Sequence, residues 1–289
     1  MKILVCGATG FVGRHLTAAL RTAGHTVIRG VRKPSQPDDI AVDYCQDTTK
    51  AAWLPKLVGV DAVVNAVGVL RDSAKQPMTM VLEQTPLALF AACQEAGVKH
   101  IVQISALGVD QGIETTYFKT RRAPEAALHK LPDTMRWLIL RPSVIYGDDG
   151  AGAKLFRMQA ALPVHCLPAG GRQRLQPVHI DDIAAAINAW LADRDARSQT
   201  VAAVGLEATD MRGMLDSYRQ QLHHTTALHI DIPYALVALS AKIGDVIPAS
   251  PLCSDTLTML NAGSSADVTA FTQLLGRLPR SYQTFIEKE

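Results

Sequence analysis

Three glycines near the start of the chain are spaced so that they could hold a phosphate group. Gly7, Gly10 and Gly13 lie in the run Gly-Ala-Thr-Gly-Phe-Val-Gly. Gly7 allows a tight turn, Gly10 leaves no side chain to block a pyrophosphate, and Gly13 lets a following helix lie close to a sheet. The start of that helix would offer free backbone N–H groups to the phosphates. The predicted cradle comprises Gly7, Thr9, Gly10, Phe11, Val12 and Gly13.

The segments on either side of these glycines are the elements that must position them. Residues 2–6 form a short apolar run typical of a buried strand, and residues 14–23 have helical spacing before Gly24 ends the helix. Strand, glycine-rich turn and helix in this order are typical of a dinucleotide-binding fold. An ordinary glycine-rich turn is the alternative.

Apolar runs and amphipathic segments alternate along the rest of the chain. They predict an α/β fold of the Rossmann type, a doubly wound parallel sheet followed by a smaller, mostly helical lobe. We expect further strands at 25–31, 40–42, 61–66, 100–104, 135–140 and 199–204, the last being the final strand, and helices at 50–58, 82–96, 117–131, 155–162, 183–191 and 210–222. Residues 148–153 are expected to form a mobile polar loop, and two or three short helices, broken at Pro248, Pro251, Gly263 and Pro279, are expected after residue 230.

A basic cluster follows the second expected strand, where such folds hold the adenosine ribose. NAD-selective sites usually place an acid there, but this chain has none between Gly13 and Asp38. Arg32 lies nineteen positions after Gly13, where a guanidinium would pair with a 2′-phosphate. The sequence therefore favours NADP(H) over NAD(H), with Arg32 as the main contact and Lys33 and Arg29 as helpers. A solvated basic turn is the alternative.

Ser105, Tyr117 and Arg121 form a second group whose spacing could support chemistry. Ser105 follows the strand expected at 100–104, at the end where active residues of open α/β sheets gather. Tyr117 begins the helix expected at 117–131. Arg121 shares a face of that helix with Tyr117, because residues i and i+4 do so. Without the glycine cradle upstream, a capping serine and a surface tyrosine would explain the same residues.

These motifs together resemble the extended and atypical short-chain dehydrogenase/reductases. The resemblance rests on the glycine run, on the Ser105 and Tyr117 pair, and on Asn65, Ala66 and Gly68, which match the family's Asn-Asn-Ala-Gly motif. It continues in residues 141–147, which are similar to Arg-Pro-x-x-Val/Ile-Tyr-Gly, and in residues 177–184, which are similar to Pro-Val-His-Val-Asp-Asp-Val-Ala. It covers residues 2–191. The atypical branch includes NADPH-binding accessory subunits of respiratory complex I and bacterial reductases or epimerases.

The resemblance implies a role for each matched residue. Ser105 would orient a carbonyl oxygen and Tyr117 would exchange the proton while hydride moves. Arg121 stands where the family has lysine; it keeps the positive charge that favours tyrosinate, but its planar fork is not equivalent to an ammonium. Asp43 would contact the adenine amino group, or is a solvated loop residue. The backbone at Pro142 and Ser143 would pack on the nicotinamide.

Two functions of different classes follow. The first is an NADP(H)-dependent oxidoreductase that acts on a small carbonyl or alcohol, with Ser105, Tyr117 and Arg121 as the catalytic group. The second is a non-catalytic NADP(H)-binding accessory subunit or redox sensor, which the arginine at position 121 favours. A sugar-nucleotide epimerase or dehydratase is a third option, although its family usually keeps the lysine.

The composition of the chain limits which classes of partner we expect it to bind. A net charge of +2 argues against nucleic acid. The best apolar run, 232–247, is interrupted and too short to span a bilayer, so only peripheral association with a membrane complex remains. Five scattered cysteines predict reduced thiols, and Met1 leads directly into a strand, so we expect a cytoplasmic monomer or homodimer without a signal peptide.

The expected domains are a Rossmann domain of residues 1–146 plus 178–205 and a substrate or partner lobe of residues 147–177 plus 206–289. We assign His179 no catalytic role and expect it to bond to the backbone. His223, His224 and His229 suggest a metal site, but we find no acid or cysteine at suitable spacing and expect no metal.

Overall fold

The computed structural model describes residues 1–247, 250 and 252–286, and divides into two compact units. The first unit comprises Met1–Arg141 and Ala184–Val201, and the second comprises Pro142–Ile183 and Ala202–Glu289. The sequence analysis suggests a substrate or partner role for residues 147–177 plus 206–289, and this role stays a prediction. The helix breaks expected at Pro248 and Pro251 lie outside the described residues.

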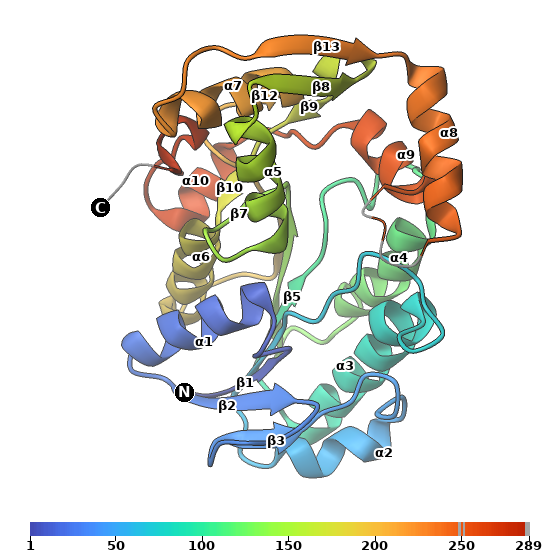
Figure 1. Cartoon of the computed structure of the whole chain (residues 1–289). Coiled ribbons are helices and arrows are strands. Elements are labelled where there is room, and N and C mark those ends of the chain that lie inside the picture. The colour runs from blue at the N-terminus through green and yellow to red at the C-terminus, as the bar shows by residue number, and fades with distance from the viewer. Residues whose placement is uncertain (248–249, 251, 287–289) are drawn as a thin grey trace. The chain divides into compact units, whose positions relative to one another are not determined.

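A seven-stranded sheet forms the centre of the first unit (Figure 1). Its order is β11 (Gln199–Ala203), β6 (Arg136–Pro142), β5 (His100–Ile104), β4 (Ala62–Asn65), β1 (Lys2–Cys6), β2 (Thr26–Val31) and β3 (Asp39–Ala41). The pairs among β1 to β6 are parallel. Chain order reverses on the two sides of β1, which gives the sheet a topological switch point beside its first strand. The predicted doubly wound α/β fold is confirmed.

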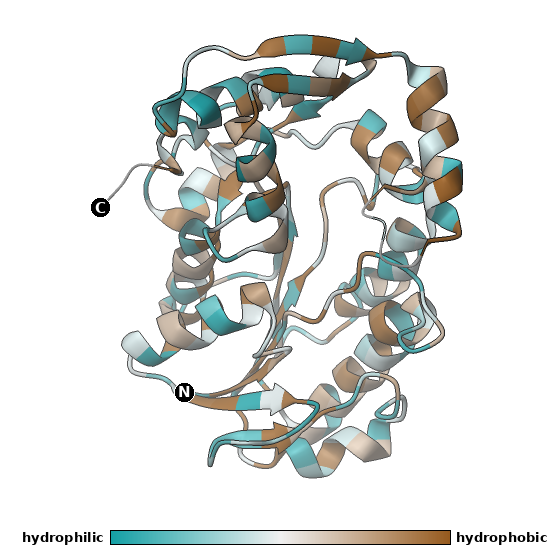
Figure 2. Cartoon of the chain, in the orientation of Figure 1, coloured by the Kyte–Doolittle hydropathy of each residue, from teal (hydrophilic) through white to brown (hydrophobic). Residues whose placement is uncertain are grey.

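Helices cover both faces of this sheet, which is why its inner strands are mostly apolar. Figure 1 shows α1 (Phe11–Thr22) and α6 (Ile180–Ala192) on one face, with α3 (Thr85–Ala96) and α4 (Thr116–Leu128) on the other. Figure 2 shows the central strands as mostly hydrophobic. The core on the α3 side is built around Leu4, Trp53, Leu89 and Phe90, each at most 1% exposed.

Two helices of the first unit differ in form from the sequence prediction. The helix expected at 50–58 is a short α2 (Lys50–Trp53) that continues as a 3₁₀ turn, η1 (Leu54–Leu57). Pro55 lacks the N–H that an α-helix needs there. The helix expected at 82–96 starts with a π-helical turn, η2 (Met80–Gln84), before α3, and Gly97 ends α3 in the left-handed conformation as expected.

In its described residues, the second unit combines short helices with three small sheets. Its pairs are β7 (Ile145–Tyr146) with β10 (Val178–His179), β8 (Val164–Pro168) with β13 (Leu228–Ile232), and β9 (Arg174–Leu175) with β12 (Thr209–Asp210). Its helices include α5 (Ala151–Ala161), α7 (Met211–Gln221), α8 (Tyr234–Asp245), α9 (Ser254–Ala262) and α10 (Thr269–Leu275), with 3₁₀ turns at Ala169–Gly171 and Tyr282–Thr284. Buried Tyr146, Met214 and Tyr218 anchor one core of this unit.

Three expectations for residues 148–204 differ from the structure. The loop expected at 148–153 ends early, because α5 begins at Ala151 with Gly150 in extended conformation before it. The strand at 199–204 is not the last, since β12 and β13 follow it. The helix expected at 183–191 begins three residues earlier, and Asp181 and Asp182 lie in its first turn. Strand β13 has alternating apolar and polar residues, the signal that could have identified it.

Candidate NAD(P)H-binding site

The three glycines form the close packing that their spacing predicts. Gly7 has φ +77°, a conformation that favours glycine, and a Cβ there would lie 3.0 Å from Cγ2 of Val67. A Cβ on Gly13 would lie 2.0 Å from the carbonyl oxygen of Gly7, so only glycine lets α1 approach this turn. The Gly10 N–H donates to the same oxygen at 2.9 Å. These contacts fix the start of α1 against the end of β1.

The first turn of α1 has donors available for an anion. Gly10 is its N-cap and supplies no side-chain hydrogen bond, and the first turn contains no acid. The first backbone N–H that bonds back to the cap belongs to Arg14, 3.0 Å from the Gly10 oxygen. The N–H groups of Phe11, Val12 and Gly13 therefore have no partner within the helix. Such a helix start attracts phosphate groups.

A cavity of about 220 Å³ lies at the carboxyl ends of β1, β2 and β4. Among its lining residues are the predicted Gly7, Thr9, Gly10, Arg32, Asp43, Ala66 and Gly68, together with Val31, Tyr44 and Cys45. These ends adjoin the switch point of the sheet, the place where open α/β folds bind dinucleotides. The donors of α1 and the glycine-lined wall fit such a ligand.

The two arginines of the basic cluster differ in their contacts: one forms an ion pair, and the other faces the cavity. Arg29 pairs with Asp39 at 3.3 Å, and Asp39 also accepts backbone N–H groups from residues 35 and 36. Arg32 lines the cavity, and no acid among the described residues pairs with it. Lys33 is exposed and does not line the cavity. Of the three cations, Arg32 is therefore the one that can meet a ligand in this cavity.

Asn65 supports the cavity from below its surface and is not among the residues that line it. The side chain is 1% exposed; its oxygen accepts from the Tyr44 hydroxyl at 2.7 Å, and its amide donates to Gln103 at 2.8 Å. The same oxygen accepts from the Val67 N–H. Asn65 thus holds the loop after β4 against the loop after β3, a positioning role that sequence matching did not reveal.

Ser105 takes part in a buried network of charged groups. Its hydroxyl donates to Glu125, whose carboxylate accepts hydrogen bonds from Nε and Nη2 of Arg141, and Arg141 also pairs with Asp110. Burial alone would lower the pKa of Arg141, but its bonds to Glu125 and Asp110 raise that pKa above its usual value. Sequence reasoning missed Glu125, which projects from the same helix as Tyr117 and Arg121.

Tyr117 and Arg121 form a stacked pair on α4. The guanidinium carbon of Arg121 lies 3.8 Å from the centre of the Tyr117 ring, and Nη1 donates to the Tyr117 carbonyl oxygen at 3.1 Å. Arg121 is 6% exposed, and its burial lowers its pKa. Its Nη2 would lie 3.7 Å from a Cβ on Gly68, which lines the cavity. Arg121 thus reaches the edge of the cavity, and its Nε is a buried donor that no described residue accepts.

Two other predicted contacts, Pro142 and Ser143, belong to the second unit, where the Ser143 hydroxyl donates to the Ser264 carbonyl at 2.7 Å. Their role toward a nicotinamide stays a prediction.

His179 accepts the Asp181 backbone N–H at 3.2 Å, as expected for a histidine bonded to the backbone. The sequence analysis found no acid at a suitable spacing from His223, His224 and His229, and this is wrong for His229. Asp216, 13 residues earlier in the sequence, lies 2.8 Å from it.

Comparison with known proteins agrees with this geometry. Residues 7–194, more than half of the chain, match the NAD(P)H-binding family. The chain therefore belongs to the NAD(P)H-binding family, which agrees with the nucleotide-binding domain that the sequence resemblance implied.

Two curated relatives illustrate the range of this family. The chain is 29% identical to a ceramide reductase of Caulobacter vibrioides over 197 residues, 65% of this chain and 60% of the relative. It is 27% identical to the mitochondrial NADH dehydrogenase [ubiquinone] 1 alpha subcomplex subunit 9 of Arabidopsis thaliana, over 65% of this chain and 50% of that protein. The chain thus spans only half to three-fifths of the length of these two relatives.

Solved structures share the fold over nearly the whole chain. The human epimerase family protein SDR39U1, crystallised with NADPH, has a TM-score of 0.75 at 22% identity and covers 99% of this chain and 98% of that one. The NADPH-dependent quinone oxidoreductase QOR2 of Escherichia coli, also with NADPH, has a TM-score of 0.75 at 17% identity, with the same coverage. Within the described part of this chain, no helix has the length and hydrophobicity required to cross a membrane.

Proposed function

We propose that this chain binds NADP(H) in preference to NAD(H) and is an oxidoreductase of the short-chain dehydrogenase/reductase type, acting on a small carbonyl or alcohol. The observation that carries the cofactor preference is Arg32, an exposed cation without an acidic partner among the described residues, in a cavity that also holds the glycine turn. A guanidinium binds phosphate through charge-assisted hydrogen bonds. Reductase-named relatives support the oxidoreductase class.

In this proposal the bound dinucleotide supplies or accepts the hydride. The Tyr117 hydroxyl gives the proton to the carbonyl oxygen during reduction and takes it back during oxidation. Arg121 keeps a cation against the face of that ring, and its Nη2 lies near Gly68 at the edge of the cavity, on the side from which a ribose would approach. Ser105 must exchange Glu125 for the carbonyl oxygen in order to orient the substrate, so this exchange is a condition of the reaction.

A second function is favoured by the same two groups. The Ser105 hydroxyl is already engaged by Glu125, and an arginine stands in the lysine position and stacks on Tyr117. Both features fit a non-catalytic NADP(H)-binding accessory subunit or sensor, in which the cofactor stabilises a surface for a partner. The relative named as a subunit of NADH dehydrogenase supports this second function. A sugar-nucleotide epimerase or dehydratase has less support, since no lysine occupies position 121.

Both functions require NADPH binding, but only the oxidoreductase should turn over a substrate, so a turnover assay distinguishes them. Fluorescence titration would first establish affinity for NADPH and NADH, and a panel of aldehydes, ketones and quinones would then be tested with NADPH. Tyr117→Phe should retain NADPH binding and reduce turnover by about 10²–10⁴-fold, because the proton donor is lost. Tyr234→Phe, at an exposed tyrosine of α8, is the matched control and should turn over normally.

Tight NADPH binding without turnover on this panel, unchanged by Arg121→Lys, would favour the accessory subunit. Turnover that persists in Tyr117→Phe would remove Tyr117 from the mechanism. Failure to bind either dinucleotide at millimolar concentration would contradict both functions.

A further inference from the structure

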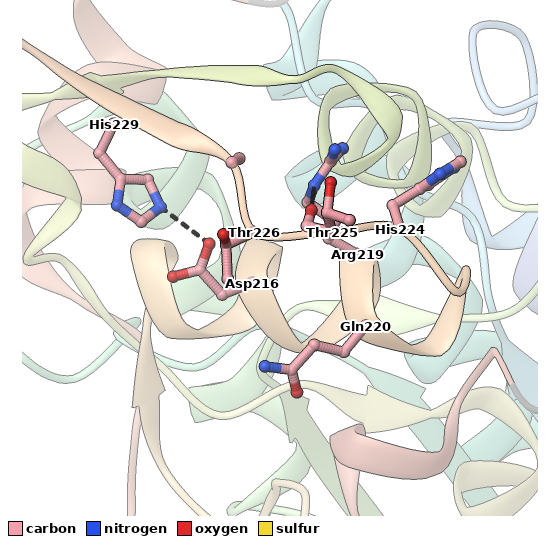
Figure 3. A pocket seen from close by; sticks show the side chains of 8 residues that line it. Asp216, Arg219, Gln220, His224, Thr225, Thr226 and His229 are labelled. Carbon is pink, nitrogen blue, oxygen red and sulfur yellow. Dashed lines mark hydrogen bonds and ion pairs between the residues drawn. The ribbon is translucent and has the colours of Figure 1, made fainter.

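Three potential metal ligands meet in the second unit, outside the cofactor cavity. Strand β13 pairs with β8 so that His229 lies directly opposite His165, and α7 places Asp216 against both. One ligand atom from each residue lies within 4.8 Å of the other two. Figure 3 shows the His229 ring and the Asp216 carboxylate pointing toward each other. Because the residues come from three elements, their sequence spacing gives no sign of this cluster.

Oδ1 of Asp216 is the shared centre of the cluster. It lies 2.8 Å from Nε2 of His229 and 3.4 Å from Nδ1 of His165. The two rings are 5.5 Å apart between centroids. In a tetrahedral zinc site with bonds near 2.0–2.1 Å, ligand atoms stand about 3.3 Å apart. The cluster therefore has the dimensions of a site that needs only small side-chain adjustments to enclose an ion.

The two ring nitrogens of His165 face two different oxygen atoms. Its side chain is fully buried, and Nε2 faces the carbonyl oxygen of Ala160 at 3.4 Å. Nδ1 lies 3.4 Å from Oδ1 of Asp216 and has no hydrogen-bond partner among the described residues. In the neutral tautomer whose Nε2–H donates to the Ala160 carbonyl, Nδ1 offers a lone pair, as a metal ligand must. A metal ion between Nδ1 and Oδ1 would satisfy both atoms.

The backbone contact of His165 resembles the outer support that metal-binding histidines usually have. Such histidines donate their second ring N–H to a carbonyl or carboxylate, which fixes the tautomer and the ring orientation. Ala160 provides that carbonyl at the end of α5. The same oxygen accepts from Arg219 at 3.0 Å, and Arg219 also donates to the carbonyls of residues 161 and 162. Arg219 therefore stabilises the end of α5 through backbone contacts.

The cluster is open on one side. A cavity of about 90 Å³ is lined by Asp216 and His229 and extends toward Arg219 and His224 (Figure 3). A water molecule occupies about 30 Å³ in the liquid, so the cavity has room for a water or a small ligand at a fourth coordination position. His224 lies at the opposite end of the drawn residues from His229 and points away from Asp216.

We propose that His165, Asp216 and His229 bind one divalent transition-metal ion, with Zn²⁺ as the ion that suits them best. Two imidazoles and one carboxylate are a common zinc ligand set, whereas Mg²⁺ and Ca²⁺ prefer oxygen ligands throughout. The fourth position, open to the cavity, would hold water. This proposal is independent of NADP(H) binding, because all three ligands belong to the second unit and the cofactor cavity belongs to the first.

The test is a metal titration of the full chain after removal of metals by a chelator. Isothermal titration with ZnCl₂ should give one ion per chain with micromolar or tighter affinity, and CoCl₂ should produce the intense visible bands of a tetrahedral site. Asp216→Asn and His229→Gln, at partly exposed positions, should each weaken Zn²⁺ at least a hundredfold. All titrations use the Cys166→Ser background, since Cys166 is an exposed thiol next to His165 that could bind zinc by itself.

His224→Gln is the matched control, because His224 lines the same cavity without belonging to the ligand group. This variant should keep its zinc affinity within about twofold. If the substitutions acted only by disturbing the cavity, His224→Gln would weaken zinc binding as well. Circular dichroism and the Tm of the chelated variants show whether each one folds. The proposal is overturned if the folded parent chain binds no zinc, or if Asp216→Asn and His224→Gln change zinc affinity equally.

Discussion

Arg32 is the side chain on which the proposed cofactor preference depends. It lines the cavity without an acidic partner among the described residues, whereas Arg29 is held by Asp39. Arg32→Ala should therefore weaken NADPH at least tenfold, about 1.4 kcal/mol, and change NADH by less than twofold, because only NADPH has the 2′-phosphate. Fluorescence titration measures both affinities. Lys33→Ala is the control and should matter little, and equal losses for the two cofactors would contradict the assignment.

Glu125 is the residue that joins the Ser105 region to Arg141. Its carboxylate is 5% exposed and accepts from Ser105 and Arg141. Glu125→Gln should cost about 2 kcal/mol in the free energy of unfolding, because it removes charge-assisted bonds from a partly buried guanidinium. Urea denaturation measures this change.

Glu114→Gln gives the matched comparison for that measurement. Glu114 is 63% exposed and pairs with Lys119 and Arg122, so its loss should destabilise the chain clearly less than Glu125→Gln does, because water screens exposed pairs. Equal destabilisation by the two substitutions would mean that the Glu125 network contributes no more than a surface pair.

Two buried thiols, one on β1 and one on α3, should make the free energy of unfolding decrease at alkaline pH. Cys6 of β1 and Cys93 of α3 are fully buried; burial raises the pKa of Cys6 to about 12 and also raises that of Cys93. Both thiols stay protonated in the folded chain where the unfolded chain would ionise them. Their stabilising effect is therefore complete below pH 9 and is lost as the pH rises from about 9 toward 12.

Cys93→Ala should reduce this pH dependence. Between pH 8 and pH 10, each thiol that ionises only on unfolding lowers the unfolding free energy by about 1 kcal/mol. The variant should therefore lose about 1 kcal/mol less than the parent over this interval, after a cost of about 1 kcal/mol at pH 8 for the deleted sulfur. Urea denaturation at the two pH values checks this. Cys166→Ser, at an exposed strand position, should leave the parent's pH dependence unchanged.

Helix α8 has apolar residues that its own unit does not cover. Leu236, Leu239 and Ile243 are each more than half exposed, and Figure 2 shows brown segments along this helix. Only Val237, Ala241 and Gly244 of α8 are buried, and the first two pack with Leu257 of α9 in a small core. The apolar run 232–247 therefore belongs to a surface helix, and much of its apolar side-chain area is exposed rather than buried.

At the scale of the whole chain, the two proposed ligands should protect different units. Hydrogen exchange should show NADPH slowing exchange in the glycine turn and at the ends of β2 and β4, because these segments line the cofactor cavity. Zinc should slow exchange in β8, α7 and β13. Protection by NADPH confined to the second unit would contradict the cofactor site, and the absence of zinc protection there would contradict the metal site.

Local sequence signals determined the elements and the glycine turn. Short-range spacing fixes how Gly7, Gly10 and Gly13 place β1 and α1, so both elements and the parallel sheet were predictable. The breaks within helices were less predictable, because a single proline or a π-helical turn changes the hydrogen-bonding pattern without changing the apolar spacing.

Tertiary structure alone decided which side chains are engaged and which remain available. Asn65 and Ser105 look similar in sequence to ligand-binding residues, but Asn65 bonds to Tyr44 and Gln103, and Ser105 donates to Glu125. The His165, Asp216 and His229 cluster depends on strand pairing and helix packing between residues far apart in the chain. Contacts of this kind follow from how complete elements pack, so the spacing of residues along the sequence could not reveal them.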